Sequence, residues 1–233
     1  MFNQERTIPI GQSVASTNTF FQKVYLWMTA GLGMTALTSF IVLASPAAQQ
    51  FIFGNKLVFY GLIFAELGLV IAISAAINRI SSMTATLMFL AYSALNGVTF
   101  AAIFLVYTRS SIVSTFLVTA GTFGAMSLYG YVTKRDMTGF GSFLFMGLIG
   151  IVIASVVNIF LKSEMIYWIT TYIGVFVFVG LTAYDTQKIK QIGQAGFADS
   201  EHQQKAAVLG ALRLYLDFIN LFLMLLRIMG NRR

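Results

Sequence analysis

The feature that most constrains the fold is a series of long apolar segments that follow one another along almost the whole chain. A helix of about 20 residues, rising 1.5 Å per residue, spans about 30 Å of hydrocarbon. Seven segments reach this length, at about 24–44, 57–77, 83–107, 112–132, 139–161, 166–186 and 206–229. Because backbone polar groups in lipid must be bonded within the chain, such segments are expected to be helices. The sequence therefore predicts an all-α integral membrane protein with seven transmembrane helices.

The composition agrees with a bilayer location and leaves little chain for anything else. Hydrophobic residues make up 58% of the chain and charged residues 10%, whereas soluble domains carry about 25% charged residues. The connections are short, apart from 45–56 and a polar loop at 187–205. We therefore predict a polar N-terminal tail (1–23), one membrane domain (24–229) and a basic C-terminal tail (230–233). The first tail lacks the pattern of a signal peptide, so the first apolar segment is expected to be an uncleaved anchor.

The distribution of basic residues predicts the orientation in the membrane. Seven crossings place the termini on opposite sides, and the N-terminal side collects Arg6, Lys23, Arg79, Lys134, Arg135, Lys188, Lys190 and Lys205. Basic loops are retained in the cytoplasm, so we expect a cytoplasmic N-terminus, although the basic C-terminal tail weakens this preference. Basic residues that are scattered over loops do not form a nucleic-acid-binding patch, and no nucleic-acid partner is expected.

The residue inventory narrows the possible chemistry. The chain has no cysteine, so it offers no disulfide, no thiolate metal site and no cysteine nucleophile. Its one histidine, His202, lies in a polar segment beside Glu201 and is expected to be solvated. We therefore predict no bound metal, no cofactor and no catalytic residue, and we do not expect an enzyme.

The last apolar segment differs from the others because it carries a polar stripe. At 100° per residue, seven of its residues fall within an arc of roughly 100°. They are Ala206, Gly210, Arg213, Asp217, Asn220, Met224 and Arg227. The other faces are apolar, and in a membrane such a stripe should face protein or water rather than lipid. We expect this helix to stand at the centre of the bundle.

Small residues recur at four-residue spacing in two other segments. The pairs are Ala120 with Gly124, Gly121 with Ala125, and Gly150 with Ala154. Such pairs allow helix backbones to approach closely in lipid, so they predict helix packing and carry no information on function.

Three acidic residues, Glu66, Asp185 and Asp217, lie inside apolar segments. A carboxyl group in a bilayer costs several kcal/mol unless it is paired or neutralised. Pairing with Arg213 or Arg79, or retention of a proton, would meet this cost. Glu66 could face a water-filled cavity or bond a neighbouring backbone group.

Asp185 and Asp217 could meet between the last two helices. These helices are antiparallel, so the carboxyl groups reach one depth only if the last helix begins upstream, within 187–205. Two carboxyl groups in contact would share one proton and respond to pH. Alternatively, Arg213 and Asp217, four residues apart on one helix, could neutralise each other.

Three stretches of the sequence resemble signatures of a known family. These are TAYDTQKIK, which closes the sixth segment, LYLDFINLFLMLLRIMGNRR, which closes the chain, and TAGTFGAMSLYGYVTKRDMTGFG, across the fourth and fifth segments. They are similar to those of the Bax inhibitor-one, or transmembrane Bax-inhibitor-motif, family, particularly its bacterial YccA- and YbhL-like members. The resemblance implies a location in the bacterial inner membrane and a seven-helix fold in which the other six helices enclose the C-terminal one.

The resemblance also implies a function. Members of this family are described as pH-sensitive calcium leak channels controlled by an aspartate pair, and Asp185 and Asp217 match its two positions. A glutamate on the second helix and an arginine near the cytoplasmic end of that helix are associated with the pathway, and Glu66 and Arg79 are the matching candidates. Arg213 could take the arginine's role, and Asn220 shares the polar stripe.

A passive cation conduit, with calcium as the transported ion, is therefore the leading hypothesis, since carboxylate oxygens suit a hard cation. One alternative is a regulatory protein of membrane stress or proteolysis, whose protein partners the sequence does not identify. Another is an intramembrane aspartyl protease, in which two aspartates activate a water. Asp217 lacks the Gly-x-Gly that precedes the second aspartate of presenilin-type proteases.

Overall fold

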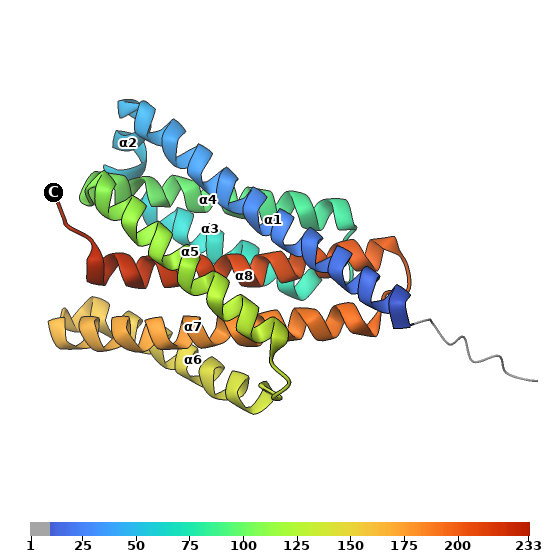
Figure 1. Cartoon of the computed structure of the whole chain (residues 1–233). Helices are drawn as coiled ribbons and strands as arrows, with labels where there is room; N and C mark the ends of the chain where they lie inside the picture. Colours follow the sequence, from blue (N-terminus) through green and yellow to red (C-terminus); the bar gives the residue numbers. More distant parts are fainter. Residues whose placement is uncertain (1–9) are drawn as a thin grey trace, which may run out of the picture.

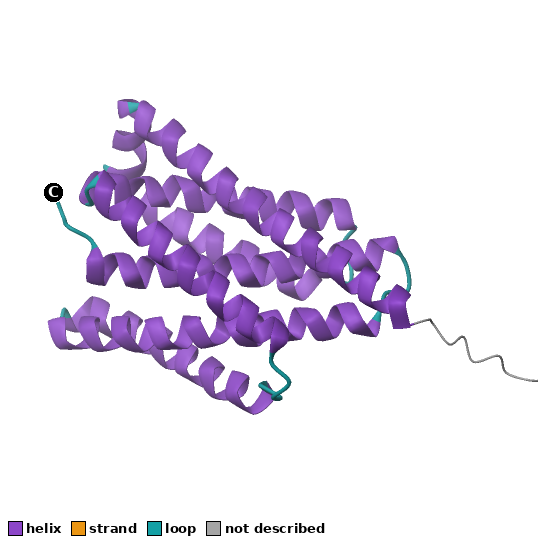
Figure 2. Ribbon diagram, in the orientation of Figure 1, coloured by secondary structure: helices purple, strands orange, loops and turns teal. Residues whose placement is uncertain are grey.

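The computed structural model describes the backbone of residues 10–233 and the side chains from Thr17 onward. This part of the chain forms eight α-helices and contains no named β-strand. The helices are α1 (Ile10–Ala44), α2 (Pro46–Phe53), α3 (Lys56–Ala76), α4 (Ser82–Val106), α5 (Arg109–Val132), α6 (Thr138–Leu161), α7 (Glu164–Ala195) and α8 (Ser200–Met229). Figure 2 shows that short loops join them.

Seven of these helices are long and apolar enough to cross a membrane, which confirms the predicted fold class. The exception is α2, a short helix within the predicted 45–56 connection. Pro46 occupies its first turn, where its missing N–H costs nothing, and the Ser45 hydroxyl accepts a hydrogen bond from the Ala48 N–H at 3.3 Å.

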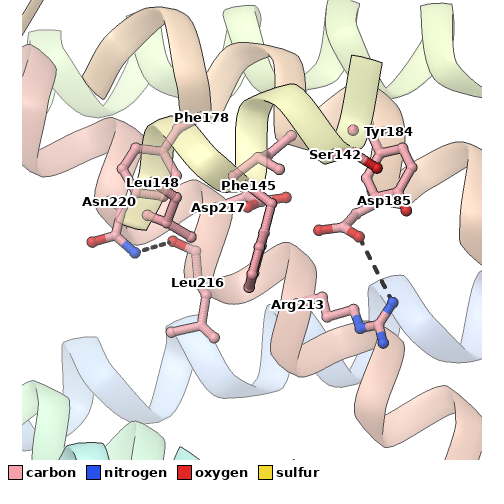
Figure 3. Close-up of a pocket in the computed structure, with 12 residues that line it drawn as sticks. Ser142, Phe145, Leu148, Phe178, Tyr184, Asp185, Arg213, Leu216, Asp217 and Asn220 are labelled. Atoms are coloured by element: carbon pink, nitrogen blue, oxygen red, sulfur yellow. Dashed lines mark hydrogen bonds and ion pairs between the residues drawn. The ribbon is translucent and has the colours of Figure 1, made fainter. Parts of the chain in front are cut away.

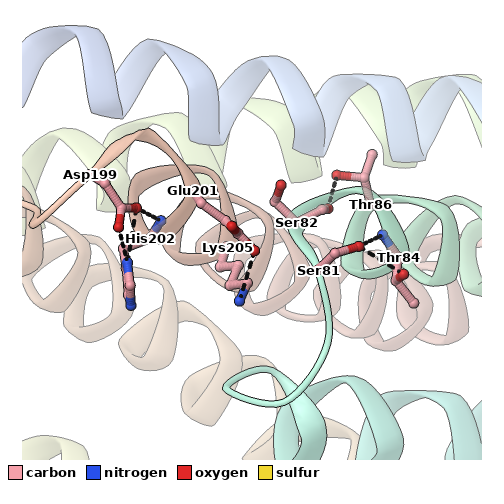
Figure 4. A network of polar contacts seen from close by, with 8 residues as sticks. All are labelled: Ser81, Ser82, Thr84, Thr86, Asp199, Glu201, His202 and Lys205. Carbon is pink, nitrogen blue, oxygen red and sulfur yellow. Dashed lines mark hydrogen bonds and ion pairs between the residues drawn. The ribbon is translucent and has the colours of Figure 1, made fainter.

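The prediction of a long polar loop at 187–205 is wrong, because two helices extend into this region. α7 continues to Ala195 and α8 begins at Ser200. Gly196, with φ of 78°, ends α7 in a conformation that favours glycine. Asp199 then caps α8 by accepting a hydrogen bond from the His202 N–H at 2.8 Å (Figure 4). The polar residues of this region therefore lie on helical extensions.

The first helix also begins earlier than predicted, at Ile10, so much of the segment expected to be a tail is helical. Residues 1–9 of that segment lie outside the described residues. At the other end, the C-terminal tail lies far from the start of α1, as seven crossings require (Figure 1).

α8 runs through the centre of the bundle, as predicted (Figure 1). It packs against α1, α4, α5 and α7. In its most apolar 18-residue stretch, 67% of the residues are buried, against 6% in α3 and 11% in α6. The expectation that all six other helices enclose it is therefore too broad: α3 packs on α2 and α4, and α6 packs on α7.

Tyr215 fixes α8 against the N-terminal helices. Its ring is fully buried and meets Phe89 and Tyr92 of α4 edge-on, with ring centroids 5.8 and 5.7 Å away. Its hydroxyl lies 2.7 Å from Thr35 Oγ1 on α1. Because a buried hydroxyl needs a partner, this hydrogen bond selects the rotation of α8 about its axis.

Glycine permits close helix contacts, but at other positions than those predicted. A Cβ atom at Gly130 of α5 would collide with the Ala183 carbonyl of α7, and one at Gly141 of α6 would collide with the Tyr184 ring. By contrast, Gly121, Gly124 and Gly150 have no neighbour within 4 Å of such an atom, so the packing predicted for their pairs is wrong.

Candidate functional site

A cavity of about 550 Å³ lies between α6, α7 and α8 (Figure 3). We name it the aspartate cavity, because both Asp185 and Asp217 line it. Its walls are Gly141, Ser142, Phe145 and Leu148 of α6, Phe178, Leu181, Tyr184 and Asp185 of α7, and Arg213, Leu216, Asp217 and Asn220 of α8. The polar stripe of α8 therefore faces a cavity within the protein, which agrees with its predicted orientation.

The helical extensions bring the two aspartates to the same cavity. The predicted condition for their meeting was a start of the last helix within 187–205, and α8 begins at Ser200. The close contacts at Gly130 and Gly141 hold α5 and α6 against the turn of α7 that ends in Asp185. Asp185 of α7 and Asp217 of α8 both line this cavity, at the interface of the two helices.

An ion pair links α8 to α7 at the aspartate cavity. Arg213 Nη1 lies 3.8 Å from Asp185 Oδ1, and the Arg213 side chain is 52% exposed against 14% for Asp185 (Figure 3). Among the described residues, Arg213 makes no ion pair with Asp217 on its own helix. The ion pair of Arg213 therefore reaches across to α7 and is not the one within α8 that the four-residue spacing allowed.

Asp217 is the most demanding polar group of the site. It is only 4% exposed, and its Oδ2 atom has no hydrogen-bond partner among the described residues. Leaving a buried acceptor unsatisfied costs about 1–3 kcal/mol, and more when the group is charged. This oxygen is therefore a buried polar atom of the aspartate cavity wall whose hydrogen bonding within the described residues is incomplete.

The third polar residue of the α8 stripe in this cavity, Asn220, is anchored by its own helix. Its Nδ2 atom donates a hydrogen bond to the Leu216 carbonyl at 2.8 Å. The amide group is thus held at the cavity wall in a fixed orientation.

Two other residues predicted from the sequence lie elsewhere. Glu66 of α3 accepts a hydrogen bond from Thr99 Oγ1 of α4 at 2.9 Å and does not line the aspartate cavity. Arg79 is exposed in the turn that follows α3. The structure therefore brings Asp185, Asp217, Arg213 and Asn220 together and leaves Glu66 and Arg79 apart from them.

Sequence reasoning missed the apolar half of the aspartate cavity, above all Phe145, Leu148 and Phe178. An apolar residue that faces a cavity has the same sequence signal as one that faces lipid. Four of its polar residues could be recognised in advance: Asp185, Arg213, Asp217 and Asn220.

Comparison with known proteins identifies the family of this chain. The family described as "Inhibitor of apoptosis-promoting Bax1" matches residues 17–233. "Inner membrane protein YbhL" of Escherichia coli strain K12 is 57% identical over 229 residues, covering 98% of each chain. A protein of Borreliella burgdorferi is 48% identical, covering 95% of this chain and 96% of its own. A membrane protein of Streptococcus pyogenes serotype M1 is 40% identical, covering 94% and 96%. Because these matches extend over almost the whole chain, it belongs to the Bax inhibitor-1 family of membrane proteins.

Proposed function

We propose that this protein is a passive cation leak channel of the bacterial inner membrane, with calcium as the principal ion and with Asp185 and Asp217 as its pH-sensitive gate. The observation that carries the proposal is the Asp217 carboxyl group, which is buried, lacks a partner at Oδ2 and faces a cavity beside a second carboxyl group. The inner-membrane location rests on the name of the E. coli relative and on the seven spans.

The chemistry of the site suits a hard cation in transit. Carboxylate and amide oxygens are the ligands that calcium prefers, and Asp185, Asp217 and Asn220 supply them. Two carboxylates alone form a weaker site than a calcium-binding loop, and weak binding allows an ion to leave. In this proposal calcium is cargo, the protein needs no resident cofactor, and it catalyses no reaction.

The gate follows from the position of the aspartates on two helices. Protonation removes negative charge from the α7–α8 interface, where Arg213 contributes the opposite charge. The balance between these charges biases the packing of α7 on α8, and a two-state helix arrangement responds to such a bias. In this proposal the N-terminus lies in the cytoplasm.

The test is a flux assay with the purified full-length protein in liposomes that contain a calcium-sensitive dye. Wild-type protein is expected to admit calcium at a rate that varies with pH. Asp185→Asn and Asp217→Asn are each expected to abolish the variation, while Asp136→Asn, in the loop before α6, leaves it intact. The proposed aspartate gate is contradicted if both variants keep the wild-type pH profile of calcium flux. The proposed channel activity is contradicted if wild-type protein admits no calcium.

A further inference from the structure

A second cavity, of about 580 Å³, lies between the same three helices, farther from the N-terminal side. We name it the distal cavity. Its polar residues are Ser155 and Asn158 of α6, Tyr167 and Thr170 of α7, and Asn220 and Arg227 of α8. It has no carboxyl group among its lining residues, and Arg227 lies over the Tyr167 ring at 5.2 Å.

The two cavities meet at three residues. Leu148, Phe178 and Asn220 line both the aspartate cavity and the distal cavity, one residue from each of the three helices. We name these three residues the neck. Phe178 is 4% exposed and belongs to an apolar cluster on which Leu148 packs.

The stripe of α8 continues past the neck. Arg213 and Asp217 line the aspartate cavity, Asn220 stands at the neck, and Met224 and Arg227 line the distal cavity. From Arg213 to Arg227 the helix rises about 21 Å, at 1.5 Å per residue. The two cavities thus follow one face of α8 over roughly two-thirds of the 30 Å hydrocarbon layer.

From this arrangement we propose that the neck is the barrier to ion passage and that the path runs along the polar stripe of α8, from the aspartate cavity to the distal cavity. The inference rests on the proposed function and adds the route and its narrowest point. Two apolar side chains at a constriction exclude water and so block an ion by loss of its hydration. Asn220 supplies the polar atom of the neck, held in place by its bond to Leu216.

The flux experiment compares Phe178→Ala with Phe176→Ala. Phe176 lies on the same helix, is 57% exposed and lines neither cavity. Phe178→Ala is expected to raise calcium flux about ten-fold, a barrier lower by about 1.4 kcal/mol, and Phe176→Ala is expected to match wild type. Leu148→Ala, at the less buried neck position, is a second widening variant in case Phe178→Ala fails to fold. Wild-type flux in every folded neck variant would overturn the proposal.

A second measurement decides the route without requiring flux. Because the chain has no cysteine, Ser142→Cys in the aspartate cavity and Ser155→Cys in the distal cavity each create a single thiol. A cationic, membrane-impermeant methanethiosulfonate is expected to reach the two thiols from opposite sides of the liposome membrane. Phe178→Ala should then allow reagent from either side to reach both.

The outcomes separate the two proposals. If wild-type protein, Phe178→Ala and Leu148→Ala all fail to admit calcium, the proposed channel activity is contradicted. Labelling of the two thiols from opposite sides of the membrane would still support a neck between two water-filled cavities. If calcium flux occurs but both thiols react from the same side, or neither reacts, the neck proposal is wrong and the path lies elsewhere.

Discussion

Arg213 of α8 pairs with Asp185 of α7 at 3.8 Å, and not with Asp217 one turn along its own helix. The distinction matters because a pair on one helix would only neutralise charge, whereas this pair joins the two helices that carry the aspartates. Asp217 is left buried with one oxygen unpartnered. In the proposed gate, a change in the charge of the cavity would act on the packing of α7 against α8 through this ion pair.

Removing the arginine tests this link. Arg213→Gln leaves two carboxyl groups without their counter-charge, and we expect the free energy of unfolding in detergent to fall by about 1 kcal/mol, since the arginine is half exposed and its pairing is partly screened. Asp185→Asn in the same chain should recover part of the loss, as a double-mutant cycle would measure. Arg79→Gln, in the exposed turn after α3, serves as the control. Equal effects of Arg213→Gln with and without Asp185→Asn would contradict the pairing.

The packing of α8 against α1 and α4 gives a second prediction. Tyr215→Phe removes the hydrogen bond to Thr35 Oγ1 while keeping the buried ring. We expect a loss of about 1 kcal/mol in the free energy of unfolding. Tyr172→Phe, on α7 and 58% exposed, is the matched control and should have no effect in the same thermal-unfolding assay. A Tyr215→Phe protein as stable as wild type would mean that ring packing alone positions α8.

Glycine positions give a third prediction, which separates close helix contacts from a mere sequence pattern. Gly130→Ala would push a methyl group into the Ala183 carbonyl, and Gly141→Ala would push one into the Tyr184 ring. Overpacking of this kind costs about 1–3 kcal/mol. Gly124→Ala, with no neighbour in reach, should be tolerated or slightly stabilising, because alanine favours a helix. If the three variants unfold at the same temperature, the close helix contacts at Gly130 and Gly141 are contradicted.

The contrast between these glycines shows what sequence can and cannot predict here. The spacing of Gly121 and Ala125 is the same as that of many packed pairs, yet Gly121 faces open space. Whether a small residue meets a partner depends on the rotation of the helix, which the even spread of polar and apolar residues around α5 and α6 does not encode. The seven spans and the central α8 were predictable because length and one polar stripe do encode them.

The polar residues of the candidate site could likewise be predicted from the sequence, whereas its apolar residues could not. Asp185, Asp217, Arg213 and Asn220 could be predicted, because charged and amide groups are costly in a bilayer and must face a cavity or a partner. Leu148 and Phe178 could not be predicted, since an apolar side chain is stable both against lipid and at the wall of a cavity. The loop predicted at 187–205 differs from the structure because a polar stretch between two spans has the same composition whether it is a loop or helix outside the hydrocarbon; the early start of α8 follows from the sequence only as the condition for the aspartates to meet.

The start of α8 provides a prediction about pH. The His202 backbone N–H, and then its side chain, hold the pKa of Asp199 below its usual 3.8. The lowered pKa means that the ionised cap stabilises the helix start above pH 3.8, and that this contribution is lost as pH falls through the lowered pKa. Amide exchange at His202 and Gln203 should therefore be slow near pH 6 and should accelerate, relative to the core of α8, when Asp199 is protonated. Asp199→Ala should remove this dependence, and its persistence would exclude Asp199 as the cap that controls it.

The charge of the distal cavity gives the last prediction. Arg227 lines that cavity and so repels cations from the proposed route. A unit charge about 8 Å from a divalent cation contributes about 1 kcal/mol in water and about 4 kcal/mol at an effective dielectric of 20, so Arg227→Gln should raise calcium flux by a factor of roughly 6 to 1,000. Arg232 lies over the Tyr107 ring in the C-terminal tail and does not line the distal cavity, so Arg232→Gln removes the same charge beyond the path and controls for general surface charge. The increase in calcium flux caused by Arg227→Gln should shrink at high salt only if water fills the space around Arg227, because screening requires mobile ions near the charge.

Equal calcium flux through the Arg227→Gln and Arg232→Gln proteins would place the ion path away from the distal cavity, whatever the behaviour of the aspartates.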